Sequence, residues 1–355
     1  MKSRCICVLL VGTLFPLQAI GQKITVQTIK SPQVFAPMQG RTGEIVQSLP
    51  GERVIDKETV NGKTSLYYLD KEGKRTKIYE GGAVEHFTRS RTGERICFHA
   101  QGKFIVKDLA TLQEFRFEEL APLYLKGFAN ISPDGDKVVF GKSPTRRSVN
   151  QSDNDNLITV RDLMTEEEQV IGKGADPKWS TVSQQIVFSI ADGHVGDWTP
   201  YLWVMNSDGT GARKLKSSIY MDGWYVTWSP DGKYVMDSDR RGNLRIVDVA
   251  KDKAVVVPPS DLGEVPNCRK SFFSTEWSPD SKTILVHVLV EREITEEIAG
   301  WELYSVSVDG GKIEKLEVPR LAMETPLWLN NEKLLYRNSQ AGDGWNEAAV
   351  RRAEQ

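Results

Sequence analysis

The histidine residues are the first candidates for chemistry, because imidazole is the side chain best suited to ligate metals or transfer protons near neutral pH. The chain has four, at His86, His99, His194 and His287. No two stand at a spacing such as His-x-His or His-x-x-x-His, which places both on one metal ion. His194 is the best candidate for proton transfer because Asp192 and Asp197 flank it, although a surface histidine is the simpler interpretation. His287 alternates within a strand-like run and is expected to be structural.

Motifs that hold cofactors are missing from the sequence. Asp153-Asn154-Asp155-Asn156 resembles the start of a calcium loop but lacks the glycine and the distal glutamate of an EF-hand. The sequence has no glycine-rich phosphate loop, no Cys-x-x-Cys pair and no Gly-x-Ser-x-Gly nucleophile elbow. We therefore expect no metal and no cofactor. Carboxylates from distant positions can still converge in a fold, so a lyase or glycosidase stays open as an alternative.

Aromatic and basic residues in long polar segments are the candidate ligand contacts. They are Arg146, Arg147, His194, Trp198, Trp224, Tyr225, Arg269 and Trp301. Exposed aromatic rings stack on sugars or anchor protein partners, and arginine binds carboxylates or phosphates. The alternatives are that the aromatic rings pack over strand ends and that the arginines are simply solvated.

A repeated turn dominates the chain. Ser-Pro-Asp-Gly or a close variant occurs at Ser132–Gly135, Ser229–Gly232 and Ser278–Ser281, with degenerate copies at Ser90 and Ser180 and weak ones at Ser48 and Trp328. From Ser90 to Ser278 the copies are spaced 42 to 49 residues apart. Proline fixes φ at the first central position, aspartate bonds to nearby backbone N–H groups, and glycine adopts positive φ. Each copy therefore predicts a β-hairpin.

The surroundings of the turn predict a four-stranded sheet in each repeat. Tryptophan precedes four copies, at Trp179, Trp228, Trp277 and Trp328. A strand-like run follows each turn, and a second hairpin follows that run. Such a sheet cannot bury both faces alone, so neighbouring sheets stack radially into an all-β propeller, and the tryptophans are expected to pack between blades. Seven first hairpins indicate seven blades, with six as the alternative, and Ile24–Ile29 could close the ring.

The repeats resemble those of the TolB-type propeller, which also occur in dipeptidyl-peptidase-like proteins and in oligogalacturonate lyase. The tightest match is the run Ser238-Asp239-Arg240-Arg241-Gly242 before a strand. The resemblance covers roughly residues 43–337 and implies the fold. The α/β domain that precedes the TolB propeller is expected to be absent, because fewer than about 25 residues separate the predicted cleavage site from the first repeat. The histidine set of the lyase manganese site cannot be matched, so neither function is implied.

The propeller topology predicts where a ligand binds. Both kinds of short turn fall on one face of the disc, and the long connections fall on the other, at roughly 142–156, 190–200, 217–225, 258–274, 288–300 and 338–346. Long loops on a rigid scaffold commonly carry function. We expect the site on the long-loop face, at the mouth of the central channel.

The N-terminus and the cysteines indicate export. Lys2 and Arg4 precede an apolar run, and small residues follow it, so residues 1–21 are typical of a signal peptide and residues 22–355 form one propeller domain. A periplasmic or extracellular location is expected, without a transmembrane segment. The two cysteines of that domain, Cys97 and Cys268, are expected to lie in separate blades and remain unpaired.

Composition and charge complete the functional expectation. The 355 residues are 39% hydrophobic with a net charge of −2, which excludes a disordered chain and offers no basic character for nucleic acid. The sequence favours a monomeric binding or scaffold protein whose partner is an envelope protein, a peptide or a glycan. The alternative is a carbohydrate-active enzyme, a lyase or glycosidase, with its site at the channel mouth.

Overall fold

A computed structural model describes most of the chain. The described residues are 24–25, 27–29, 43–118, 129–142, 156–192, 199–216, 226–238, 242–318, 326–337 and 345–349. They form β-strands and one 3-10 helix, η2 (Pro259–Leu262). Within these ranges no helix has the length and apolar character needed to cross a membrane.

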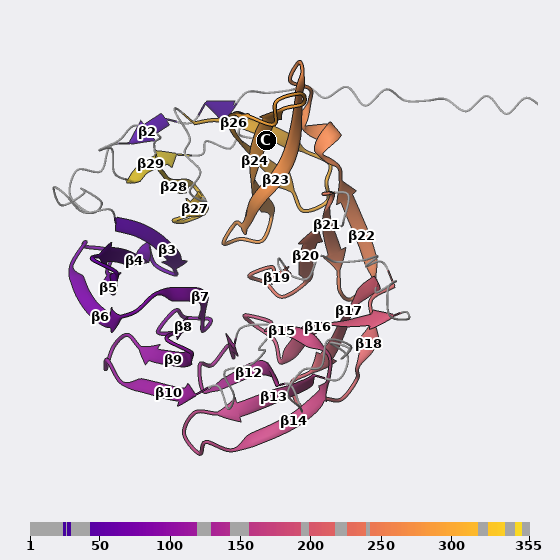
Figure 1. The fold of residues 1–355 in the computed structure, drawn as a ribbon. Coiled ribbons are helices and arrows are strands. Elements are labelled where there is room, and N and C mark those ends of the chain that lie inside the picture. Colours follow the sequence, from indigo (N-terminus) through magenta and orange to yellow (C-terminus); the bar gives the residue numbers. More distant parts are fainter. Residues whose placement is uncertain are drawn as a thin grey trace, which may run out of the picture.

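The described strands form seven sheets arranged in a ring, six with four strands and one with five (Figure 1). Blade 1 holds β3 (Gly43–Leu49), β4 (Arg53–Val60), β5 (Lys63–Leu69) and β6 (Arg75–Gly81). Blade 2 holds β7 (Val84–Arg89), β8 (Arg95–Ala100), β9 (Lys103–Asp108) and β10 (Glu114–Glu118). Blade 3 holds β11 (Asn130–Ile131), β12 (Lys137–Lys142), β13 (Leu157–Asp162) and β14 (Glu168–Lys173). Blade 4 holds β15 (Ala175–Trp179), β16 (Gln185–Asp192), β17 (Thr199–Asn206) and β18 (Arg213–Lys214).

The remaining three blades complete the ring. Blade 5 holds β19 (Thr227–Trp228), β20 (Tyr234–Ser238), β21 (Leu244–Asp248) and β22 (Lys253–Val257). Blade 6 holds β23 (Cys268–Trp277), β24 (Thr283–Arg292), β25 (Ile298–Ser307), β26 (Ile313–Glu317) and β1 (Ile24–Thr25). Blade 7 holds β27 (Leu327–Trp328), β28 (Lys333–Arg337), β29 (Trp345–Ala349) and β2 (Gln27–Ile29). The predicted seven-bladed all-β propeller is confirmed.

The N-terminal segment closes the ring, as its alternation predicts, but it serves two blades. β2 pairs antiparallel with β29, opposing Gln27 to Ala349 and Ile29 to Glu347. β1 pairs in parallel with β26 of the preceding blade. The last blade therefore takes its outer strand from the beginning of the chain, which joins the two ends of the ring by backbone hydrogen bonds.

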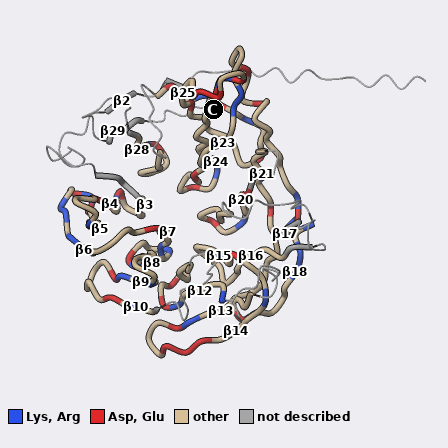
Figure 2. Tube along the Cα trace, viewed as in Figure 1, with Lys and Arg blue, Asp and Glu red and all other residues tan. Residues whose placement is uncertain are grey.

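The core lies between neighbouring blades. The first strand of each blade is nearest the centre of the ring and the fourth is outside (Figure 1). The repeated Trp179, Trp228, Trp277 and Trp328 are all buried. Trp277 of blade 6 packs in one cluster with Met236 of blade 5, which confirms the predicted packing between blades. Acidic and basic residues are mixed round the described ring and leave no basic sector (Figure 2).

The Ser-Pro-Asp-Gly turn is held by its own side chains. Ser229 Oγ donates to Asp231 Oδ1 at 2.7 Å and accepts from the N–H of Tyr234 at 3.0 Å. Asp231 Oδ1 also accepts from the N–H of Lys233 at 3.1 Å. Gly232 has φ +69°, a conformation that side chains disfavour. The turn therefore forms as its sequence predicts and connects the first two strands of the blade.

Candidate functional site

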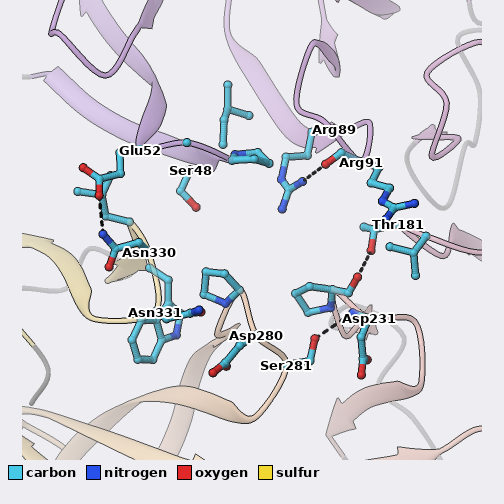
Figure 3. A pocket seen from close by; sticks show the side chains of 18 residues that line it. Ser48, Glu52, Arg89, Arg91, Thr181, Asp231, Asp280, Ser281, Asn330 and Asn331 are labelled. Atoms are coloured by element: carbon cyan, nitrogen blue, oxygen red, sulfur yellow. Dashed lines mark hydrogen bonds between the residues drawn. The ribbon is translucent and has the colours of Figure 1, made fainter. Parts of the chain in front are cut away.

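The turns of six blades surround a pocket at the centre of the ring, which we call the axial pocket (Figure 3). Its volume is about 790 Å³. It is lined by Ser48–Glu52, Arg89, Arg91, Thr181, Val182, Pro230, Asp231, Pro279–Ser281 and Trp328–Asn331. All of these residues belong to the first-to-second-strand turns or to the strand ends beside them. The axial pocket is therefore on the short-turn face.

Neighbouring turns brace one another around the axial pocket. Ser281 Oγ of blade 6 accepts from the N–H of Asp231 in blade 5 at 2.9 Å. Thr181 Oγ1 of blade 4 donates to the carbonyl oxygen of Pro230 in blade 5 at 3.3 Å. These contacts hold the pocket wall rigid, because each turn is tied to a neighbouring blade as well as to its own strands.

The acidic residues that line the axial pocket have partners within the wall. Glu52 Oε1 accepts from Asn330 Nδ2 at 2.6 Å, which joins blade 1 to blade 7 (Figure 3). Asp280 Oδ1 accepts from Ser278 Oγ at 2.7 Å and from the N–H of Lys282 at 3.1 Å. Asp231 is held in its turn in the same way. These carboxylates stabilise turns first and are only partly available to a ligand.

Arg89 differs from the other pocket residues. It occupies the position before the turn serine, where four other blades have the buried tryptophan. Its guanidinium points into the axial pocket (Figure 3). Its Nη1 makes only long contacts, 3.3 Å to the carbonyl oxygen of Ser90 and 3.4 Å to that of Arg91. Burial lowers the pKa of Arg89, the charge of Glu276 opposes this shift, and the charge of Arg53 adds to it.

Two further charged side chains lie two residues before the turn serine of their blades. Glu276 is in blade 6 and Lys178 in blade 4, and each is half-buried. Burial raises the pKa of Glu276 to about 7, and the charge of Arg89 limits that rise. Burial lowers the pKa of Lys178, and Asp176 opposes the shift. Across the described residues, neither Glu276 nor Lys178 has an ion-pair partner within 4.0 Å.

These charges act across the central channel. Blades 2 and 6 are not neighbours in the ring, yet Arg89 and Glu276 shift each other's pKa. Likewise Lys178 of blade 4 contributes to the lowered pKa of His86 in blade 2, after the larger effect of burial. Arg89, Glu276 and Lys178 each stand one or two residues before a turn that borders the axial pocket, so these charges lie at the inner strands of their blades.

Most of the sequence-predicted site lies outside the described residues. This holds for Arg146, Arg147, His194, Trp198, Trp224 and Tyr225, and the long-loop face stays a prediction. Arg269 is exposed and pairs with Glu291 at 3.0 Å. Trp301 is half-buried, with its ring 4.9 Å from that of Phe273 and 4.8 Å from that of His287.

Sequence reasoning missed the axial pocket because it assigned function to long loops. The signal was present: Arg89 replaces tryptophan in a repeat whose other positions are structural. The same position holds tryptophan in four blades and isoleucine (Ile131) in blade 3, so a charged residue there departs from the packing that most blades share. His287 is buried, as expected of a structural histidine. Cys97 in blade 2 and Cys268 in blade 6 are free thiols, which confirms their predicted separation.

The described residues contain no group of three or more His, Cys, Asp or Glu side chains that could hold a metal ion. In the motif that resembles TolB, residues 239–241 lie outside the described part. Gly242 has φ +74° and β21 follows, as the motif predicts.

Comparisons with known proteins identify a β-propeller. No protein-family model and no curated protein matches the chain. The structure is similar to oligogalacturonate lyase from Vibrio parahaemolyticus, at 16% identity and TM-score 0.62, covering 94% of this chain and 100% of that one. It is similar to an oligogalacturonate lyase in complex with manganese, at 16% identity and TM-score 0.60, covering 95% and 99%. TolB from Acinetobacter baumannii matches at 17% identity and TM-score 0.48, covering 77% and 65%. These likenesses show the fold alone.

Proposed function

We propose that this chain is a binding protein that holds a peptide segment of a partner protein in the axial pocket. The single observation that carries the proposal is the shape of the short-turn face. Six blades contribute to one concave pocket of about 790 Å³, with Arg89 directed into it. Concave sites with apolar walls and a few placed polar groups are typical of ligand pockets. Here Pro50, Pro230 and Pro279 supply apolar wall, and the turns supply rigidity.

The proposal is tested by filling the axial pocket. Asn331 lines the pocket from blade 7 and is exposed, so Asn331→Trp blocks it without opening the core. The matched control is Val256→Trp, at a half-exposed position on the outer strand β22. Short peptides are selected from a displayed random library on the full domain, and their affinities are then measured by calorimetry.

The expected result is at least a tenfold loss of affinity in Asn331→Trp and unchanged affinity in Val256→Trp. Equal binding by the domain and by Asn331→Trp contradicts the axial pocket as the site. Peptides that bind the domain but are insensitive to Asn331→Trp can then be tested against the long-loop candidates, beginning with Arg269→Ala and Trp301→Ala.

One observation favours a second candidate function, a carbohydrate-active lyase or glycosidase. Glu276 has a pKa of about 7 in the channel, and a group with that pKa is well suited to proton transfer at neutral pH. The test is product formation from acidic and neutral oligosaccharides by the domain and by Glu276→Gln. Turnover that disappears in Glu276→Gln supports the enzymatic function. The absence of turnover with every oligosaccharide contradicts that function and is consistent with the binding function.

Export is a further part of the proposal. Its support is the pattern of residues 1–21, with basic residues, an apolar run and small residues in that order. Expression of the whole chain followed by mass determination is expected to give a product that begins at Gln22 and is recovered outside the cytoplasm. A product of full length retained in the cytoplasm contradicts it.

A further inference from the structure

Arg89 has the features of an anion-binding residue. An arginine guanidinium carries five N–H donors in a rigid fork. In Arg89 only Nη1 has contacts, and both exceed 3.2 Å, so the rest of the fork has no hydrogen-bond partner among the described residues. By contrast, Arg53 beside it donates to the carbonyl oxygens of Pro50 and Thr92, both at 2.6 Å.

The charge of Arg89 is poorly compensated within the protein. Burial and the positive charge of Arg53 both disfavour its protonated form. Among the described residues, the one negative charge that shifts the pKa of Arg89 is that of Glu276 in blade 6. Glu276 is beyond 4.0 Å and about half protonated near neutral pH, because its pKa is about 7. The carboxylates that line the axial pocket, Glu52, Asp231 and Asp280, already accept hydrogen bonds from the wall. An incoming anion therefore gains a strong partner without displacing an existing ion pair.

We propose that the axial pocket binds its ligand through a carboxylate group that pairs with the guanidinium of Arg89. This inference rests on the proposed binding function and names the chemical group that is recognised. Arginine and carboxylate form two parallel hydrogen bonds, which fix orientation as well as charge.

A singly charged carboxylate fits the pocket better than a phosphate. Glu52, Asp231 and Asp280 also line the wall and repel negative charge. The repulsion grows with the charge of the ligand, and a phosphomonoester carries nearly two charges at pH 7. A peptide can supply the carboxylate from its C-terminus or from an acidic side chain, and both sources present the same chemistry to Arg89.

The experiment uses four acetylated tripeptides that differ only in carboxylates. They are acetyl-Ala-Ala-Glu and acetyl-Ala-Ala-Gln, each with a free or an amidated C-terminus. Each is titrated into the full domain by calorimetry. Binding of the free-terminus glutamine peptide identifies the C-terminus as the source, and binding of the amidated glutamate peptide identifies the side chain. Equal affinity of all four peptides, including the one without a carboxylate, overturns the proposal.

Variants of Arg89 separate a binding role from a structural one. Arg89→Gln and Arg89→Trp are each expected to lower the affinity for peptides that carry a carboxylate at least tenfold. Arg89→Trp introduces the residue that four other blades have at this position, so it is expected to remain folded with an unchanged or higher Tm. Arg116→Gln, an exposed position on β10 of the same blade, is the control and is expected to bind normally. Unchanged affinity in both Arg89 variants overturns the proposal.

The two pocket variants distinguish a wrong carboxylate contact from a wrong binding function. If Asn331→Trp abolishes the binding of library peptides but Arg89→Gln does not, the axial pocket binds ligands without a carboxylate contact. The proposed carboxylate contact is then wrong, while the proposed binding function stands. If neither variant weakens the binding of library peptides, the proposed function is wrong as well.

Discussion

Trp277 of blade 6 donates its indole N–H to the hydroxyl oxygen of Thr227 on blade 5, at 3.1 Å. The same two repeat positions are joined in the preceding blades. Trp228 donates from Nε1 to the carbonyl oxygen of Lys178 at 3.0 Å, and the N–H of Trp179 donates to Asn130 Oδ1 at 2.8 Å. In each case the residue before the turn serine binds the residue two before the serine of the previous blade. The inner strands of blades 3 to 6 are thus linked in series.

Thr227→Val is expected to destabilise the domain through this link. The substitution keeps the shape but removes the acceptor of the buried Trp277 indole, at a cost of about 1 kcal/mol. Thr227→Ser retains the hydroxyl and serves as the control, with a much smaller effect expected. Urea unfolding measures both. Equal stability of Thr227→Val and the unaltered domain would show that water replaces the hydroxyl at no cost.

Ser281 has a strained backbone and a hydroxyl that bonds to another blade. Its φ is +61°, where the other two close copies of the turn have glycine, and its Oγ accepts from the N–H of Asp231 in the preceding blade. Ser281→Ala keeps the strain and loses the hydrogen bond, so we expect a loss of about 1 to 2 kcal/mol. Ser281→Gly loses the same bond but relieves roughly 1 kcal/mol of backbone strain. Glycine is therefore expected to be the milder substitution, and unfolding free energies in the reverse order would contradict this explanation.

Burial decides how much two arginine–carboxylate pairs contribute. Arg245 makes two hydrogen bonds to Asp237, both at 2.7 Å, and both side chains are almost fully buried. Asp237→Ala leaves a buried guanidinium without that carboxylate and is expected to cost about 3 to 5 kcal/mol. Glu291→Ala breaks the exposed pair with Arg269 and is expected to cost less than about 1 kcal/mol. Similar losses in the two variants, measured by denaturant unfolding, would refute the dependence on burial.

The fold was predictable from the sequence because its information is local. Each Ser-Pro-Asp-Gly turn determines a hairpin, and each tryptophan before it determines a buried contact, so repetition alone specifies the ring. Ring closure was predictable only in part. The alternation of Ile24–Ile29 indicates a strand, but the division between β26 and β29 depends on where the ring ends meet. Repeat spacing carries no information about that meeting point.

The candidate site was less predictable because it is formed by residues far apart in the chain. Arg89 and Glu276 come from blades 2 and 6, which are not neighbours, and only the closed ring brings their charges near enough to affect each other's pKa. Neither residue belongs to a motif. The departure of Arg89 from the repeated tryptophan was the one indication available, and it becomes meaningful only when the position is known to border a pocket.

Glu276 is expected to make the stability of the domain depend on pH. Its pKa is about 7 in the folded state, above the ordinary value of 4.5, because burial favours the neutral acid. The folded state therefore holds the proton more tightly than the unfolded state. Stability attributable to this group is greatest below about pH 4.5, falls as the pH rises toward 7, and changes little above that. The loss is bounded at roughly 3 kcal/mol.

Glu276→Gln tests this dependence because glutamine stays neutral at every pH. Relative to the unaltered domain, its Tm is expected to be a few degrees higher at pH 8 and similar or lower at pH 5, with Glu72→Gln, at an exposed turn, as the control. Arg89→Gln removes the opposing charge, so it is expected to raise the pKa of Glu276 further. The loss of stability then continues to a higher pH. A carboxyl titration of Glu276 followed by NMR gives that pKa directly. A midpoint near 4.5 in the unaltered domain, unmoved by Arg89→Gln, would show that water fills the channel and screens the two residues from each other.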